Sequence, residues 1–274
     1  MESASGAATI AILCSTADPA SLNIAERLRE AGGWKREAPG VESRPGLLLA
    51  VRETPLLQMD GADRELKEAG FRFDALVFAS RHVSRAGRAC YALHFPGNVG
   101  EAPFGGRERQ LAAAAPGHLK ALAFALRASG REVAIECTHH GPTGISTPCL
   151  FAEIGCTEAE WRDPEWARPL ARALLNLEPA SGRTLVGFGG GHYVPRPARL
   201  LFETPLLFGH MFSSYQIPDL DGDRVAEALR LSGTREALAD RKGTTSEERK
   251  KLRALVESAG GMMVREAELR AAPD

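Results

Sequence analysis

The sequence lacks three features that would mark a membrane or secreted protein. Its longest apolar runs fall well short of the roughly 18 residues that cross a bilayer. Its five cysteines are odd in number and form no CxxC pair, which indicates reduced thiols rather than a disulfide framework. Residues 1–8 contain no basic segment followed by an apolar one, so we expect no signal peptide. Together these absences predict a cytoplasmic protein that does not enter a membrane.

The sequence also has no excess of positive charge. It contains 34 lysines and arginines against 35 aspartates and glutamates, which gives a net charge of −1 at pH 7. No global positive field would therefore attract a nucleic acid, so any such binding must come from a local patch. The 274 residues show no internal repeat, and 44% of them are hydrophobic, as in an ordinary folded protein.

Apolar, strand-like runs alternate with helical patterns along the chain. Strands are expected at residues 8–15, 47–51, 73–80, 89–95, 131–138 and 184–189. Helices are expected at residues 21–31 and 117–129 and, in two pieces broken near Pro164 and Pro169, at 158–177. This alternation predicts an α/β fold with a mostly parallel sheet that helices cover on both faces.

Two parts of the chain depart from the alternation. Residues 96–116 are rich in glycine and proline and are expected to form a loop-rich insertion. Residues 219–274 are charged and are expected to form a helical C-terminal segment, in which Ser246 is the N-cap of a helix. We expect residues 1–274 to make a single α/β domain, although the length also allows two small ones.

The most distinctive stretch places two adjacent histidines, His139 and His140, directly before the turn Gly141–Gly144. Neighbouring residues of a strand point to opposite faces, so the two rings can converge only if the chain leaves the strand between them. The Gly-Pro pair supplies such a bend. Imidazoles can shuttle protons, bind a metal or donate to an anion. The alternative is an ordinary turn whose histidines make structural hydrogen bonds.

Histidines also follow other expected strands, at His82, His94 and His192. In a parallel sheet the ligand crevice lies beyond the carboxyl ends of the strands, so we expect these rings to meet there. His192 follows Gly189–Gly191, whose backbone N–H groups can approach and cradle an anion. For His94, a buried structural role is the alternative.

Five segments between about residue 75 and residue 252 match one known family in order. They are Ser80–Ser84, His94–Asn98, His139–Thr143, Gly189–Arg196 and Phe208–His210, and Lys242–Gly243 with Ser246–Arg249 also fits. These segments resemble the D-aminoacyl-tRNA deacylases of the type found in archaea and plants. The resemblance implies a hydrolase that removes D-amino acids from tRNA as a proofreading step in translation. It also implies a three-layer α/β/α fold related to phosphorylases and peptidyl-tRNA hydrolases, and bound zinc.

The matched segments supply candidates for each role. The catalytic candidates are His139, His140, His192 and Thr143, whose hydroxyl could donate to an oxyanion. The metal candidates are His139, His140, His82 and His192, although the absence of HExxH leaves the ligand set open. The substrate-binding candidates are Ser80, Arg81, His82, Asn98, Gly141, Gly190, Gly191, Tyr193, Arg196 and His210. Tyr193 and Tyr215 could stack on the terminal adenine.

The expected reaction is attack of water on the aminoacyl ester, with zinc or a histidine as activator. We expect the partner to be a tRNA carrying a D-amino acid and the protein to be a monomer. One alternative is a hydrolase of another ester or amide on the same scaffold. Another is a non-catalytic RNA- or phosphate-binding module that uses Arg81, Arg85, Arg88 and Arg196. A thiol-nucleophile enzyme is a third, more distant alternative.

Overall fold

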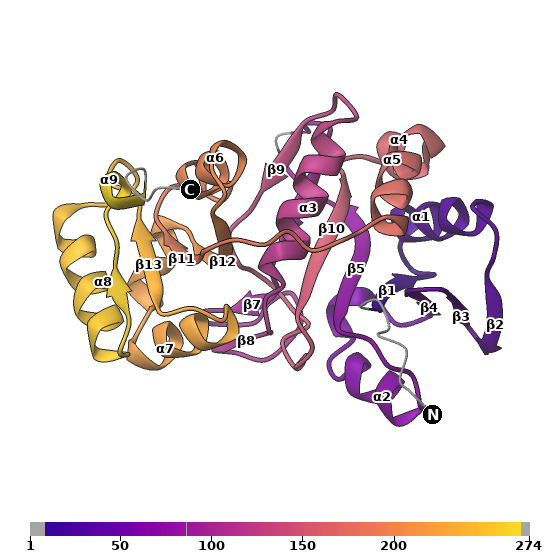
Figure 1. The fold of residues 1–274 in the computed structure, drawn as a ribbon, viewed down its shortest axis with the longest axis horizontal. Helices are drawn as coiled ribbons and strands as arrows, with labels where there is room; N and C mark the ends of the chain where they lie inside the picture. The colour runs from indigo at the N-terminus through magenta and orange to yellow at the C-terminus, as the bar shows by residue number, and fades with distance from the viewer. Residues whose placement is uncertain (1–8, 86, 270–274) are drawn as a thin grey trace.

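An eight-stranded mixed sheet runs through the larger part of the protein (Figure 1). The computed structural model describes residues 9–85 and 87–269. The strand order is β2-β3-β4-β1-β5-β10-β6-β9. The strands are β1 Ile10–Ser15, β2 Lys35–Ala38, β3 Val41–Arg44, β4 Leu47–Arg52, β5 Ala75–His82, β6 Cys90–His94, β9 Val133–Ile135 and β10 Cys149–Gly155. β4, β1, β5 and β10 are parallel, whereas β6 is antiparallel to β10 and parallel to β9.

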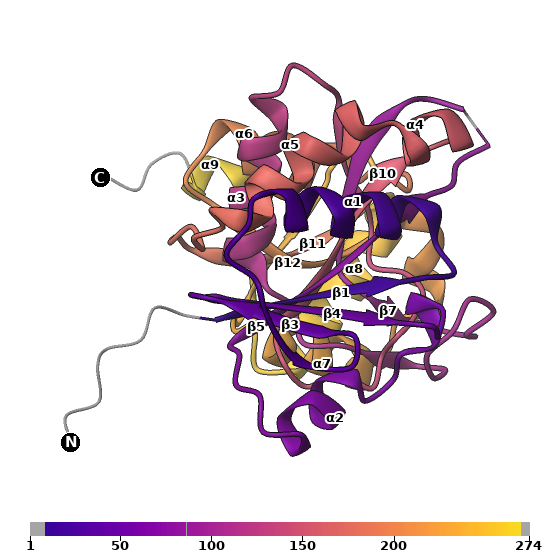
Figure 2. The ribbon, with the colours of Figure 1, turned by 90° about the vertical axis from the view of Figure 1, so that its right-hand side faces the viewer.

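Helices cover both faces of this sheet (Figure 2). α1 Pro19–Glu30, α3 Pro116–Arg127 and α5 Pro164–Leu175 share one apolar core with it, and α4 Glu158–Arg162 packs beside α1. The opposite face packs on η1 Leu56–Gln58 and α2 Ala62–Glu68. Consecutive residues of β5, such as Val77 and Phe78, belong to different cores because strand side chains alternate. The two faces are therefore buried by different parts of the chain.

A second, fully parallel sheet has the order β12-β11-β13-β14. Its strands are β11 Thr184–Phe188, β12 Leu207–Phe212, β13 Glu236–Ala239 and β14 Met262–Met263. Its helical elements are α6 Pro195–Glu203, η2 Ser214–Asp219, α7 Gly222–Leu231, α8 Ser246–Ser258 and α9 Glu266–Leu269. The chain that leaves β9 joins the two sheets, because the Cys137 N–H donates to His192 O at 2.7 Å and the Thr138 N–H donates to Met211 O at 2.6 Å.

The predicted α/β class with a mixed, mostly parallel sheet is confirmed, and each of the six expected strands is present. Three strands that position the site were not expected, namely β10, β12 and β13. β13 and β14 contradict a purely helical segment 219–274, because this segment supplies two strands to the second sheet. Residues 96–116 form mainly loop, with a short pair of strands, β7 Gly97–Asn98 and β8 Gln110–Leu111.

The expected N-cap of the last long helix is one residue too late. Thr245 caps α8, since its hydroxyl accepts from the Glu248 N–H and the Glu248 carboxylate accepts from the Thr245 N–H. Both bonds of a capping box are therefore made, which Ser246 could not do with Arg249 as its partner. In residues 9–85 and 87–269, no helix has the length and apolarity that crossing a membrane requires.

Candidate active site

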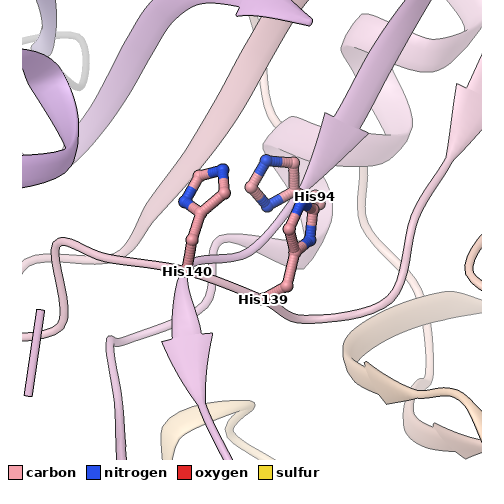
Figure 3. Close-up of side chains that lie close together, drawn as sticks. All are labelled: His94, His139 and His140. Atoms are coloured by element: carbon pink, nitrogen blue, oxygen red, sulfur yellow. The ribbon is translucent and has the colours of Figure 1, made fainter. Parts of the chain in front are cut away.

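Three imidazoles lie against one another where β6 ends and where the chain leaves β9 (Figure 3). The ring centroids of His94 and His139 are 4.1 Å apart, those of His94 and His140 are 4.6 Å apart, and those of His139 and His140 are 4.4 Å apart. His140 has a φ of 43°, in the left-handed region, so the backbone turns sharply between the two adjacent histidines. The predicted bend that lets neighbouring rings converge is confirmed.

In each of these rings, Nδ1 forms a hydrogen bond with a backbone carbonyl oxygen. His139 Nδ1 lies 2.8 Å from Cys137 O, His140 Nδ1 lies 2.8 Å from Gly141 O, and His94 Nδ1 lies 3.3 Å from Phe95 O. A ring that donates from Nδ1 keeps Nε2 unprotonated, as metal-bound histidines do. One ring nitrogen from each histidine lies within 4.8 Å of the others, so this group, the histidine triad His94, His139 and His140, could hold a metal ion.

Burial keeps His139 and His140 of the triad neutral. Burial, reinforced by the neighbouring His94, lowers the pKa of His140 to about 3. The same causes hold the pKa of His139 well below its usual value. Neutral imidazoles are the form that binds metals, so no proton must be displaced at pH 7.

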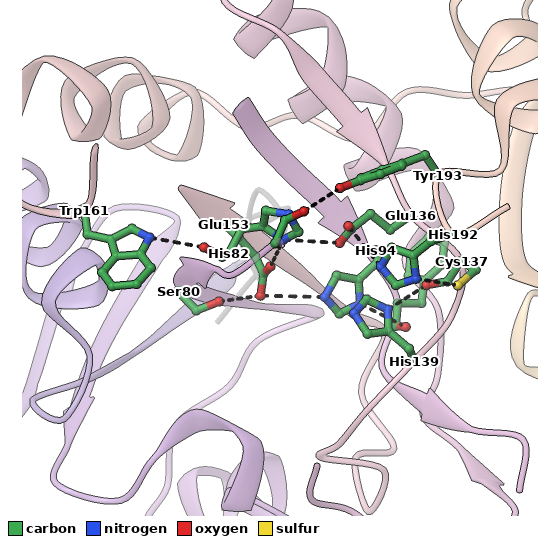
Figure 4. Close-up of polar contacts among 12 residues, drawn as sticks. Ser80, His82, His94, Glu136, Cys137, His139, Glu153, Trp161, His192 and Tyr193 are labelled. Carbon is green, nitrogen blue, oxygen red and sulfur yellow. Dashed lines mark hydrogen bonds and ion pairs between the residues drawn. The ribbon is translucent and has the colours of Figure 1, made fainter. Parts of the chain in front are cut away.

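A second group consists of His82, Glu136 and Glu153, all almost fully buried. His82 Nδ1 lies 3.3 Å from Glu153 Oε2 and 3.7 Å from Glu136 Oε2. The Ser80 hydroxyl donates to Glu153 Oε1 at 2.7 Å (Figure 4). A Cβ on Gly155 would lie 2.7 Å from His82 Cβ, so the glycine makes room for this imidazole.

In this second group, the carboxylates and the His82 imidazole stabilise each other's charged forms. Burial alone would raise the pKa of Glu153, but the hydrogen bond from His82 and the neighbouring His94 hold it well below its usual value. Burial alone would lower the pKa of His82, but Glu153 and Glu136 raise it. Neither carboxylate oxygen of Glu136 has a hydrogen-bond partner of good geometry in the described chain. Its oxygens face the imidazoles of His192 and His82 at 3.1 and 3.7 Å, and a bound cation would also stabilise this buried charge.

A third group links the two sheets through His192 and Cys137. His192 Nε2 lies 3.1 Å from Glu136 Oε1, and His192 Nδ1 lies 3.4 Å from Cys137 Sγ and 3.0 Å from Tyr215 Oη. The Cys137 thiol and the Glu136 carboxylate raise the pKa of His192. Cys137, His139 and His192 also lie close enough to share a metal ion. The side chain of His192 is 36% exposed, so this group reaches the surface.

His82, His94 and Glu153 lie on one face of the main sheet, and not all of them are at its carboxyl edge. Because β6 is antiparallel to β10, the carboxyl end of β6 does not coincide with that of β5. The register instead places Glu153 opposite Ser80, and Phe151 opposite His94. Directly paired residues point to the same face, so Glu153 bridges His82 on one side and His94 on the other, with His94 Nε2 3.7 Å from Glu153 Oε1.

The structure brings together five of the predicted site residues. His82, His139, His140 and His192 belong to the three groups, and Ser80 orients Glu153. The predicted four-histidine ligand set is divided among these groups. Tyr193 lies at the exposed rim with its hydroxyl 3.2 Å from Ser84 Oγ. Glu153 is not among the residues that the sequence predicts for the site. An acid inside the apolar run Cys149–Gly155 was the available signal for Glu153.

The predicted site residues Thr143, Asn98 and Gly141 all bond to the loop that contains Phe104. The Thr143 hydroxyl donates to Gln110 Oε1 and accepts from the Arg107 N–H, so it has no hydrogen left for an oxyanion. The Asn98 amide donates to Gly105 O and Arg107 O. The Gly141 N–H donates to Phe104 O.

The side chains of the predicted substrate-binding residues Arg81 and His82 do not lie together. Arg81 and His82 are consecutive strand residues and point to opposite faces, so they do not form one phosphate site. Arg81 lies over the ring of Trp161, and Arg196 is paired with Glu266.

Of the predicted glycine cradle, only part is available. The Gly190 N–H is shared between Gly243 O and Ser214 Oγ. The Gly191 N–H makes no hydrogen bond within the described residues, so it can donate to a ligand.

His210, which the sequence predicts as a substrate contact, is buried between the segments that contain Thr138 and Ala112. Its side chain is 0% exposed, with Nδ1 3.0 Å from Thr138 Oγ1 and Nε2 2.9 Å from Ala112 O. Since Thr138 Oγ1 accepts from the Met211 N–H, its hydrogen goes to His210 Nδ1, and His210 Nε2–H donates to Ala112 O. Burial lowers the pKa of His210 to about 4.

We expect His210 to make the protein sensitive to acid. Above pH about 6.5 His210 is neutral in both states, and below it the unfolded chain binds a proton that the folded protein resists. Stability should therefore fall between pH 6.5 and 4 by up to about 1.4 kcal/mol per pH unit. Urea unfolding of wild type and His210→Gln between these values tests this. A stability difference between the two proteins that does not change with pH would contradict it.

Two cavities in the described chain are lined by residues outside these histidine groups. One, of about 720 Å³, lies beside Thr143 and Arg107. The other, of about 1060 Å³, lies between α6 and α8 and contains Arg196.

Comparison with known proteins gives a consistent picture. Residues 69–264 match the family model described as D-aminoacyl-tRNA deacylase. A D-aminoacyl-tRNA deacylase of Methanosarcina mazei is 37% identical over 278 residues, covering 95% of this chain and 93% of that protein. One of Methanococcoides burtonii is 37% identical over 276 residues, and the chain spans 57% of its length. A solved structure of a conserved protein of unknown function, AF0625, covers 97% of this chain with a TM-score of 0.89 and 32% identity.

Proposed function

This chain belongs to the D-aminoacyl-tRNA deacylase family, and on that basis we propose that it hydrolyses the ester that joins a D-amino acid to tRNA. The products would be the free D-amino acid and tRNA, so the activity serves proofreading in translation. The observation that carries the proposal is the close packing of His94, His139 and His140, with Glu136, Glu153 and His192 beside them. This arrangement contains the bases, acids and candidate metal ligands that ester hydrolysis uses.

We further propose that the cofactor is zinc. Three imidazoles and two buried carboxylates are nitrogen and oxygen ligands that suit Zn²⁺. The histidine triad would hold the ion, and the group of His82, Glu136 and Glu153 would orient it or hold another. A bound zinc would supply a Lewis acid that polarises the ester carbonyl.

The chain's own residues account for the proton transfers. Glu136 Oε1 and His192 Nε2, 3.1 Å apart, form a pair that can take a proton from the attacking water. The same pair can return that proton to the ribose oxygen that leaves. The Gly191 N–H, which has no partner within the described residues, can donate to the developing oxyanion.

Turnover of matched D- and L-aminoacyl-tRNAs tests the proposed function. The purified chain is expected to hydrolyse the D-ester well above the spontaneous rate and to leave the L-ester nearly untouched. Equal rates for both would point to a general esterase on the same scaffold. An absence of hydrolysis with either substrate would rule out the deacylase activity.

A thiol nucleophile is the second candidate, because Cys137 Sγ lies 3.4 Å from His192 Nδ1 and His192 in turn faces Glu136. This contact places a cysteine beside a possible base, which the sequence alone does not show. If water is the nucleophile, Cys137→Ala should keep D-ester hydrolysis within about tenfold of wild type. A loss comparable to that of a triad histidine, with zinc content unchanged, would favour the thiol.

The proposed function also carries proposals for the partner, the compartment and the oligomeric state. The partner would be a tRNA that carries a D-amino acid, the compartment the cytoplasm, and the protein a monomer. We also propose that the two sheets act as a single catalytic domain. His192 follows β11 of the second sheet, whereas His94 and Glu153 lie on the first.

A further inference from the structure

The larger cavity of the described chain is strongly basic. It measures about 1060 Å³ and is lined by eight lysines and arginines but only two acidic residues. The whole protein carries a net charge of −1, so the rest of the chain is net acidic. We call this cavity the basic groove; it lies between the start of α6, the end of β13, α8 and the segment leading into α9 (Figure 1).

Several of the cations in the groove have no acidic partner. Arg241, Lys242, Lys250 and Arg265 are exposed, and none of them forms an ion pair with another described residue. Arg196 shows how the groove would hold an anion, because two of its nitrogens contact the Glu266 carboxylate. A guanidinium presents the same two-pronged contact to a phosphate.

The groove is joined to the candidate active site by one short loop. His192 precedes Pro195, the first residue of α6 in the groove, by three positions, so their Cα atoms lie at most about 11 Å apart. The loop that contains His192 also packs against residues 243–244, which lead into α8. The Gly190 N–H donates to Gly243 O at 3.1 Å, and a Cβ on Gly189 would lie 2.6 Å from Thr244 Cγ2.

We propose that the basic groove binds the phosphodiester backbone of the RNA strand whose 3′ end carries the aminoacyl ester. This inference rests on the proposed function. Each phosphate adds one negative charge to the RNA strand. The groove's cations that form no ion pair within the described residues lie close to the proposed reaction site, so they can attract these phosphates. The groove supplies the local patch that an otherwise acidic protein needs to bind RNA. Contacts to the backbone carry no base specificity, which suits an enzyme that must accept tRNAs of different sequence.

The test removes three of the unpaired charges together, as Lys242→Gln, Lys250→Gln and Arg265→Gln. Their side chains make no ion pair with residues 9–85 and 87–269, so the variant should fold normally. We expect KM for D-aminoacyl-tRNA to rise at least about tenfold at unchanged kcat, and the salt dependence of tRNA binding to weaken by about two units of slope. Hydrolysis of 3′-O-(D-aminoacyl)adenosine, which has no phosphate, should match wild type.

A matched control removes three exposed cations elsewhere, Lys35, Arg162 and Arg168, whose side chains are 79%, 66% and 48% exposed. An equal loss in the control, an unchanged KM and salt slope in the groove variant, or an equal loss on the adenosine ester would each overturn the groove proposal. Failure of the proposed function is recognised separately, because the wild-type protein would then hydrolyse neither D-ester.

Discussion

Replacing His140 with alanine should lower the rate of D-aminoacyl-tRNA hydrolysis by about 10²–10⁴-fold. The imidazole of His140 packs against those of His94 and His139, and its Nδ1 is fixed by Gly141 O at 2.8 Å. Its removal leaves two of the three ring nitrogens that could hold a metal ion. The rate is measured in a single turnover with enzyme in excess, together with zinc bound per protein, which should also fall.

The matched control is His118→Ala. His118 lies on α3 and belongs to none of the groups that could hold a metal. Its removal should leave the hydrolysis rate within about twofold of wild type. A wild-type rate for His140→Ala, with the fold confirmed by circular dichroism, would remove the histidine triad from the reaction.

Glu153→Gln should weaken zinc binding by about 10–100-fold and reduce kcat with it. The change keeps the shape of a 4% exposed side chain and removes the charge that lies between His82 and His94. It should also lower the pKa of His82, because the hydrogen bond to Glu153 is the strongest contribution that raises it. Nuclear magnetic resonance of the metal-free protein measures that pKa directly.

A purely structural role for Glu153 would lower stability and the pKa of His82 but leave zinc affinity and kcat unchanged. The control is Glu158→Gln, which removes an exposed acid at the start of α4. It should change neither zinc affinity nor the pKa of His82. If Glu153→Gln leaves both quantities at their wild-type values, the proposed bridge between His82 and His94 is wrong.

The sequence predicts the fold class and the gathering of histidines because both depend on local patterns. Strand-like runs show the α/β alternation, and the Gly-Pro turn after His140 accounts for the sharp bend that the structure contains. β10 escaped prediction because Cys149–Gly155 is a short run with an acid inside it. It becomes a central strand only through pairing with β5 and β6, which are distant in sequence.

The motifs alone do not show which of their polar side chains face the candidate site and which are bonded to other parts of the protein. His210, Asn98 and Thr143 lie in or beside matched segments, yet their polar atoms are bonded to other parts of the protein. Burial of this kind depends on which distant backbone groups approach each side chain. Glu153 shows the converse, because it becomes a candidate site residue only when the sheet register sets it between two histidines.

The most direct test of the account measures D-aminoacyl-tRNA hydrolysis by the intact chain before and after removal of metal with a chelator. The account predicts hydrolysis by the metal-bound protein, loss of that activity with the metal, and recovery when stoichiometric Zn²⁺ is added. His140→Ala should not recover under the same conditions. Full activity in protein shown to be free of metal, or the same recovery in His140→Ala as in wild type, would contradict the assignment of the histidine triad as the metal-dependent catalytic centre.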